Sequence, residues 1–188
     1  MNVPLPDYRV YHQIETYIYD DVGYRFRSGQ PINAHDFFCI IIWKANRAKS
    51  KEYTRLMLRR LQGERTIDDV ITRVVLSLRQ ATNARERINI LLNDFGFRFP
   101  IATAILSVFY PEDFTIYDVR VAGELGNLPD PGAVRDNNER WNRYSRYLDG
   151  VRQCCHDNNL PSLRDADRWL WGRSVCLQLN DDLERGFV

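Results

Sequence analysis

Apolar residues recur at helical spacing along most of the chain, and the pattern is sharpest between residues 88 and 125. Two amphipathic segments there are separated by the break GFRFP at residues 96–100. A glycine can end one helix, and a proline suits the first turn of the next. The apolar positions of the two segments are Ile88, Leu91, Leu92 and Phe95, then Ala102, Ile105, Leu106 and Phe109. The pattern therefore predicts a helical hairpin over residues 88–109.

The remaining periodicity predicts further helices and no strong strand. The predicted spans are 7–28 closed by Gly29, 31–46 capped by Asn33, 51–61 closed by Gly63, 67–78 opened by a capping box of Thr66 and Asp69, a helix capped by Asn83 that runs into the hairpin, 138–156, and 163–179 opened by Ser162 and Asp165. We expect a single all-α domain over residues 1–188, a compact bundle of about eight or nine helices.

A short extended segment follows the hairpin and leads to an aspartate. Residues 111–117 lack helical periodicity, and Asp118 stands at the start of a predicted helix that runs through Leu125. A carboxylate at that position caps exposed backbone N–H groups and faces the positive end of the helix dipole. The dipole favours the ionised form of Asp118, which suits an electrostatic role in a site.

Composition narrows the class of protein without identifying a partner. The formal charge is only +1; three of the 26 basic residues are lysine and the other 23 are arginine, a side chain suited to phosphate and to stacking on bases. A high-GC genome would give the same bias. No apolar run is as long as a membrane span, and residues 1–7 lack the basic-then-apolar order of a signal peptide. We therefore expect a cytoplasmic protein with no membrane partner.

The cysteines give no sign of a metal site. Cys39, Cys154, Cys155 and Cys176 form no C-x-x-C pair and have no zinc spacing with the three histidines. We expect all four to be reduced, and we expect no metal or organic cofactor.

The hairpin and the aspartate after it resemble the helix-hairpin-helix DNA glycosylase superfamily, which includes endonuclease III and 8-oxoguanine DNA glycosylase. Gly96 aligns with the first hairpin glycine of the family and Pro100 with the position of its lysine. Asp118 lies eighteen residues after Pro100, in the phrase YDVRV, where the family aspartate is expected. The phrases WKANRAKS and LRDADRWLW look like those of a small uncharacterised bacterial branch, so the resemblance covers about residues 37–171.

The resemblance implies a role for each matching residue. Asp118 would be the catalytic carboxylate. The residues implied for the base pocket, or for filling the gap left by an extracted base, are Trp43, Lys44, Asn46 and Tyr117. The residues implied for DNA phosphate are Arg47, Gly96, Phe97, Arg98 and Arg120, and the family often holds a monovalent cation at the hairpin. DNA is the implied partner, the protein is expected to be a monomer, and the iron–sulfur loop of some relatives is missing.

Simpler interpretations remain open for each of these residues. A plain helix cap explains Asp118, and core packing explains Trp43 and Tyr117. A helix end that meets water explains the polar run from Lys44 to Arg47. The context of the hairpin is what favours the functional interpretation.

Two departures from the family pattern bear on the reaction. Arg98 replaces the second hairpin glycine, which adds a potential phosphate contact and alters the turn. Pro100 replaces the lysine, and no lysine follows Lys51. A Schiff-base nucleophile at the usual place is therefore impossible, and only Lys44 or the N-terminal amine could replace it.

The sequence thus leads to three hypotheses. The first is a monofunctional DNA glycosylase that hydrolyses the N-glycosidic bond of a damaged or modified base without lyase activity. The second is a catalytically inactive DNA-binding module of the same fold, and the third is a helical interaction protein without nucleic acid. The sequence leaves open which base is recognised, whether the substrate is DNA, RNA or a nucleoside, and whether the role is repair or defence against phage.

Overall fold

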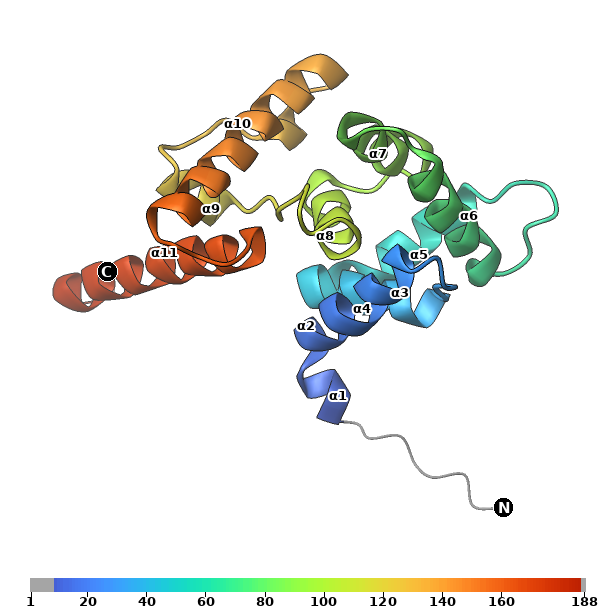
Figure 1. The fold of residues 1–188 in the computed structure, drawn as a ribbon, viewed down its shortest axis with the longest axis horizontal. Helices are drawn as coiled ribbons and strands as arrows, with labels where there is room; N and C mark the ends of the chain where they lie inside the picture. Colours follow the sequence, from blue (N-terminus) through green and yellow to red (C-terminus); the bar gives the residue numbers. More distant parts are fainter. Residues whose placement is uncertain (1–8, 187–188) are drawn as a thin grey trace.

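The computed structural model describes residues 9–186, and every regular element in that range is helical, which confirms the all-α prediction (Figure 1). The elements are α1 Arg9–His12, α2 Ile14–Thr16, η1 Tyr17–Val22, α3 Gly23–Arg27, α4 Ala34–Ala45, η2 Asn46–Ala48, α5 Lys49–Leu58, α6 Ile67–Gln80, α7 Ala84–Asn89, η3 Ile90–Asp94, α8 Phe99–Phe109, α9 Val119–Glu124, η4 Pro131–Ala133, α10 Asn137–Asp157 and α11 Leu163–Arg185. Segments η1 and η3 are π-helical, and η2 and η4 are 3-10 turns. No helix in the described range is both long and apolar enough to span a membrane.

The predicted helix starts are confirmed where a side chain caps them. Asn33 opens α4 and Thr66 opens α6, each in a reciprocal capping box with the residue three positions later. Asn83 caps α7 and Ser162 caps α11, and each side chain accepts a hydrogen bond from the backbone N–H three positions later. These caps are local, so the sequence pattern is enough to locate them.

Two predicted helix ends are wrong, and the first helix is only partly testable. Helix α5 ends at Leu58 instead of 61, and Leu61 is 57% exposed, so no packing holds it in a helix. Helix α11 continues to Arg185 instead of 179, and Gly186 ends it with φ +76°. The helix predicted over 7–28 begins with residues 7 and 8, which lie outside the described range.

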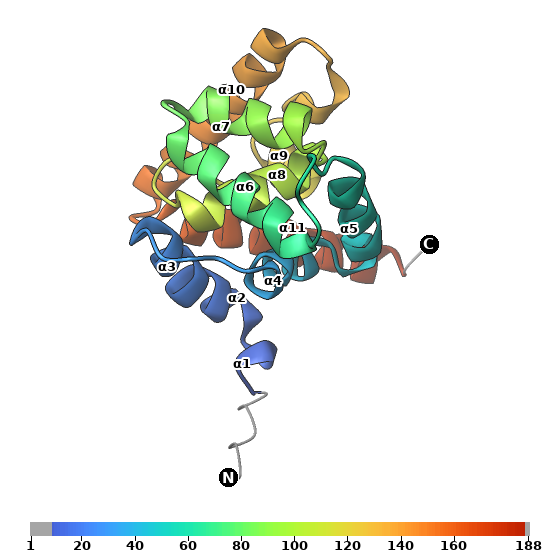
Figure 2. The ribbon, with the colours of Figure 1, turned by 90° about the vertical axis from the view of Figure 1, so that its right-hand side faces the viewer.

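Helix α8 is the centre of the molecule. Ten of its eleven residues are buried, and it contacts α3, α4 and α7. Helices α5, α6 and α7 lie on one side of it, and α9, α10 and α11 lie on the other (Figures 1 and 2). An almost wholly apolar helix must be surrounded on all sides, because each exposed face would leave apolar area in water.

The turn before α8 is a helical hairpin, as predicted. Gly96 has φ +73°, and Phe97 N–H donates to Leu91 O at 2.9 Å, so the turn closes on the preceding helix. The guanidinium of Arg59 lies against Gly96, where an added Cβ would come within 2.5 Å of it. Glycine is therefore required by the backbone conformation, whereas the flexible Arg59 side chain could move away from an added Cβ.

Two tyrosines of α10 bind the extended segment after α8. Tyr144 Oη donates to Thr115 O at 2.6 Å and accepts from Thr115 N–H at 3.2 Å. Tyr147 Oη donates to Ile116 O at 2.8 Å. Thr103 Oγ1 of α8 accepts from the backbone of the same segment at Tyr117 N–H, at 3.0 Å. The segment crosses the interior without a helix or a sheet because side chains supply its hydrogen bonds.

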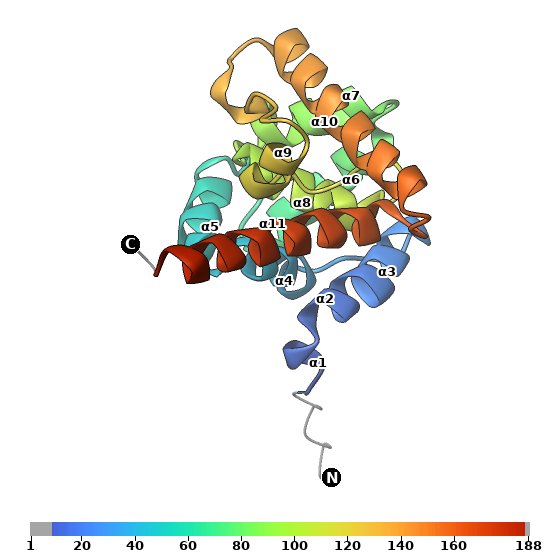
Figure 3. The same ribbon diagram turned by 90° about the vertical axis from the view of Figure 1, so that its left-hand side faces the viewer.

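Helix α11 completes the fold by running along α9 and α10 (Figure 3). Its first half packs through Leu163, Ala166 and Leu170, while its second half carries the exposed Leu177, Leu179 and Leu183. The first half therefore packs into the core, and the contact with α9 extends into the second half, where Gln178 hydrogen-bonds Arg120.

Removal of the Tyr144 hydroxyl should destabilise the fold. In Tyr144→Phe, the N–H and C=O of Thr115 are left buried and unpaired, which should lower the free energy of unfolding by about 1–3 kcal/mol. Urea denaturation measures the loss. The control is Tyr24→Phe, since Tyr24 is 58% exposed; equal effects of the two substitutions would contradict the structural role of Tyr144.

Candidate functional site

Asp118 stands at the end of the extended segment and caps α9, as predicted. Its Oδ1 accepts from Arg120 N–H at 2.9 Å, and its own N–H donates to Tyr147 Oη at 3.3 Å. The side chain is 25% exposed. The backbone of Asp118 is therefore held by Tyr147, its carboxylate is held by the N–H of Arg120, and the side chain still reaches solvent.

Lys44 meets this carboxylate from the last turn of α4. Its Nζ lies 3.1 Å from Asp118 Oδ2, although the two residues are 74 positions apart. The side chains are 18% and 25% exposed. Both carboxylate oxygens are thus engaged, one by a backbone N–H and one by the side chain of Lys44.

The Lys44–Asp118 pair lies in the wall of a pocket of about 530 Å³. Its lining residues are Glu15, Trp43, Lys44, Ile116, Asp118, Asp167, Arg168 and Trp171. Trp43 comes from α4 and Trp171 from α11, and the edge of the Trp43 ring contacts Tyr19 with 5.6 Å between ring centroids. A pocket with indole walls and a carboxylate has the size and polarity of a small-molecule or nucleobase site. The structure brings Trp43, Lys44 and Asp118 together, as the resemblance implied.

Asp167 is a second carboxyl in this pocket, and sequence reasoning missed it. Its Oδ1 is inaccessible to solvent and has no hydrogen-bond partner among residues 9–186. Burial raises the pKa of Asp167 to about 7, and the nearby charges of Asp118 and Glu15 add to the shift while Lys44 opposes it. The only sequence signal was an acidic residue inside an otherwise amphipathic helix.

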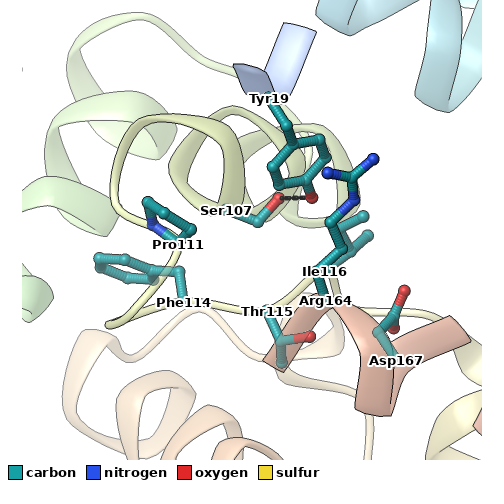
Figure 4. Close-up of a pocket in the computed structure, with 8 residues that line it drawn as sticks. All are labelled: Tyr19, Ser107, Pro111, Phe114, Thr115, Ile116, Arg164 and Asp167. Carbon is teal, nitrogen blue, oxygen red and sulfur yellow. Dashed lines mark hydrogen bonds between the residues drawn. The ribbon is translucent and has the colours of Figure 1, made fainter. Parts of the chain in front are cut away.

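A small interior cavity lies behind Asp167 (Figure 4). It has a volume of about 10 Å³ and is lined by polar groups of Tyr19, Ser107, Thr115 and Asp167. Tyr19 and Ser107 hydrogen-bond through their hydroxyls at 3.0 Å, whereas Thr115 Oγ1 is buried without a partner in the described part of the chain. Asp167 and Ile116 line both the Asp118 pocket and this cavity, so the two spaces are neighbours.

A second pocket, of about 320 Å³, lies beside the hairpin and is basic. Its lining residues are Ala45, Arg47, Ala48, Lys51, Glu52, Arg55, Arg98, Pro100 and Ile101. Arg55 is neutralised by the buried Glu52, with 2.5 Å between Nη1 and Oε2. For the range 9–186, no ion pair is seen to Arg47, Lys51 or Arg98. This basic pocket therefore has three cationic side chains free to meet an anion.

The end of α4 separates the two pockets. Trp43 and Lys44 line the Asp118 pocket, and Ala45, Arg47 and Ala48 line the basic pocket. Asn46 lies at this tip, exposed, and its Oδ1 accepts from Lys49 Nζ at 2.7 Å. Arg47 and Arg98, both predicted to bind DNA phosphate, line the same basic pocket. Neither of them lines the Asp118 pocket.

Other predicted site residues lie elsewhere. Tyr117 is 2% exposed and packs against Phe99 and Tyr147, so it belongs to the core and lines neither pocket. Phe97 is 3% exposed and its N–H is used within the hairpin, so it offers no donor to a phosphate. Gly96 lies under Arg59, as described above. Arg120 is exposed and hydrogen-bonds Gln178 of α11.

Metal chemistry has no candidate site in the described range, where no cluster of three or more His, Cys, Asp or Glu side chains could hold an ion. Cys39 and Cys154 are buried, and burial raises the pKa of both thiols. All four cysteines are free. The groups that could react or bind in the Asp118 pocket are three carboxyls, one lysine, one arginine and two indoles.

Replacement of Asp167 should make the protein more stable at alkaline pH. The folded state binds a proton with pKa about 7 against the ordinary 3.8, so wild-type stability falls as pH rises from about 4 to 7. Asp167→Asn does not titrate, so its stability relative to wild type should grow by up to about 4 kcal/mol between pH 4 and pH 8. Thermal unfolding across this pH range measures the change. The control is Asp149→Asn, whose side chain is 70% exposed; parallel profiles for both variants would contradict the assignment.

Comparison with known proteins identifies no family for this chain. No protein-family model matches the chain, no curated protein matches it, and no solved structure matches it. The function is therefore inferred from the two pockets themselves.

Proposed function

We propose that the protein is a DNA glycosylase that hydrolyses the bond between a damaged or modified base and its sugar. The observation that carries the proposal is the position of Asp118, in the wall of a pocket large enough for a base and beside a basic pocket at a helical hairpin. A base extruded from the duplex would enter between Trp43 and Trp171, and the phosphates of its strand would lie on the basic pocket.

The role of Asp118 follows from the charge of the reaction. Cleavage of an N-glycosidic bond develops positive charge on the sugar, and a fixed carboxylate stabilises that charge and orients a water molecule. The N–H of Arg120 and the side chain of Lys44 hold the carboxylate in place in the pocket wall. Its helix-cap geometry keeps it from rotating away from the pocket.

Lys44 supports hydrolysis and not strand cleavage. A lyase needs a lysine whose nitrogen attacks the sugar, and Lys44 Nζ is instead engaged by Asp118 at 3.1 Å. Pro100 stands at the hairpin position where the family carries its lysine. We therefore propose a monofunctional enzyme that leaves an abasic strand uncut.

The basic pocket favours a polymer over a free nucleoside. A nucleoside has no flanking phosphate, so Arg47, Lys51 and Arg98 would have no partner in that complex. A strand that crosses the tip of α4 would meet all three. Asn46 at the same tip is then placed to fill the gap left by the extruded base.

The second candidate function is a DNA-binding module without catalysis. Both oxygens of Asp118 are already engaged within the protein, which is the observation that favours it. In that case the same two pockets bind a strand and an unpaired base but release nothing. Base release is therefore the measurement that separates the two functions.

The Asp118→Asn variant tests the catalytic proposal. Asparagine caps helices as well as aspartate does, so the fold should survive. Release of the base from a panel of lesion-containing duplexes should fall at least about 100-fold under single-turnover conditions. Affinity for the same duplexes should change less than about threefold, and the wild-type product should be cut only after alkali. Equal release by the variant would refute Asp118 as the catalytic group, and binding without release by wild type would favour the inactive module.

Arg47 and Arg98 should each contribute a phosphate contact. Arg47→Ala and Arg98→Ala should weaken binding to duplexes of any sequence and lower the slope of log K against log salt by about one each. Fluorescence anisotropy at several salt concentrations measures both. Arg152→Ala is the matched control, since Arg152 lies on α10, is 48% exposed and lines neither pocket; a similar loss there would argue against the basic pocket as the binding surface.

A further inference from the structure

We propose that Asp167 is the proton donor to the departing base, and that the substrate of this pocket is a base without a positive charge. The inference rests on the proposed glycosylase function and adds a second reacting group and a substrate class to it. Of the three carboxyls in the pocket, Glu15 is paired with two arginines, whereas Asp118 and Asp167 lie in opposite surroundings.

The two carboxyls differ in what surrounds them. Asp118 has a backbone N–H on one oxygen and an ammonium on the other. Asp167 has an Oδ1 shut away from solvent without any partner in the described chain. A buried oxygen without a donor favours the neutral acid, because a charge there would lose its hydration and gain nothing. Such a pair separates naturally into one acid and one anion.

The cations near Asp167 are committed to other acids. The charged and titratable groups near it are Lys44 from α4, Asp118 from the start of α9, Glu15 from α2, Tyr19 from η1, Tyr144 and Tyr147 from α10, and Arg164 and Arg168 from α11 itself. Lys44 pairs with Asp118. Arg164 and Arg168 both pair with Glu15, at 3.2 and 2.9 Å. Burial therefore dominates, and it raises the pKa of Asp167 to about 7.

Two neighbouring spaces border Asp167, a small cavity and the Asp118 pocket. One face of Asp167 borders the cavity that also contains Thr115 and the Tyr19–Ser107 pair (Figure 4). The other face borders the pocket of Asp118 and the two indoles. Its proton is therefore held by burial but delivered into the space where a base would lie.

The proton balance closes without another reactant. As the C1′–N bond breaks, its electron pair stays on the base, and a ring nitrogen of the base takes the proton from Asp167. Asp118 stabilises the sugar cation, water adds to C1′, and the proton released by that water returns to the Asp167 carboxylate. The net reaction consumes one water and yields the free base and an abasic sugar.

The proton donor determines which bases benefit. An uncharged base would leave as an anion unless it is protonated, so a positioned acid lowers the barrier to its departure. An N-alkylated cationic base leaves as a neutral molecule and gains little from an acid. A general acid contributes about 100- to 10,000-fold to rates of this kind. The pocket therefore fits uncharged lesions.

The experiment compares wild type, Asp167→Asn and Asp149→Asn on two sets of duplexes. One set contains the uncharged bases hypoxanthine, uracil and 8-oxoguanine, and the other contains the cationic bases 7-methylguanine and 3-methyladenine. Asp167→Asn should slow release of the uncharged base at least about 100-fold and of the cationic base less than about threefold. The wild-type rate on the uncharged base should fall as pH rises through about 7, and this fall should be missing in the variant.

The other outcomes refute either the proton donor alone or the glycosylase function together with it. The proton donor is refuted if wild type releases only cationic bases. It is also refuted if Asp167→Asn releases the uncharged base as fast as wild type. Neither result refutes base release that depends on Asp118. Wild type that releases nothing refutes the glycosylase and the proton donor together. A carboxyl-carbon NMR titration supplies a readout independent of activity. One carboxyl that titrates near pH 7 should be lost in Asp167→Asn and kept in Asp149→Asn, and its absence from wild type also refutes the inference.

Discussion

The arrangement of the site depends on two buried tyrosine hydroxyls of α10. Tyr144 and Tyr147 supply the hydrogen bonds of an extended segment that crosses the interior with no sheet partner. A backbone in that position would otherwise bury unpaired N–H and C=O groups, each at a cost comparable to a lost hydrogen bond. Because Asp118 is the last residue of this segment, the same two hydroxyls fix where the carboxylate lies relative to Lys44.

The local parts of this design were predictable from the sequence. The hairpin, the caps at Asn33, Thr66 and Asn83, and the position of Asp118 at a helix start all depend on side chains within a few residues of each other. Lys44 and Trp43 were also placed in the base pocket, but through the resemblance and not through any pattern of their own. The contact between Lys44 and Asp118 spans 74 positions, and nothing in the local sequence encodes it.

The rest was not predictable because it depends on direction and on distant packing. Side chains alternate along an extended segment, so Ile116 and Asp118 face the pocket while Tyr117 faces the core. That alternation argues against Tyr117 as a pocket wall once the segment is known to be extended. Asp167 and Trp171 enter the pocket only because α11 runs past α9, a crossing set by helix packing and not by a motif.

Arg59 lies against the hairpin glycine and so changes the electrostatic potential at the turn. Arg59 places its guanidinium against Gly96, and its carbonyl accepts from Arg73, which in turn pairs with Glu64. A mobile monovalent cation that approached this turn would be repelled by the fixed positive charge. The Arg59 guanidinium therefore gives this turn a positive charge that favours an anion, and because Arg59 is exposed this attraction weakens as the salt concentration rises.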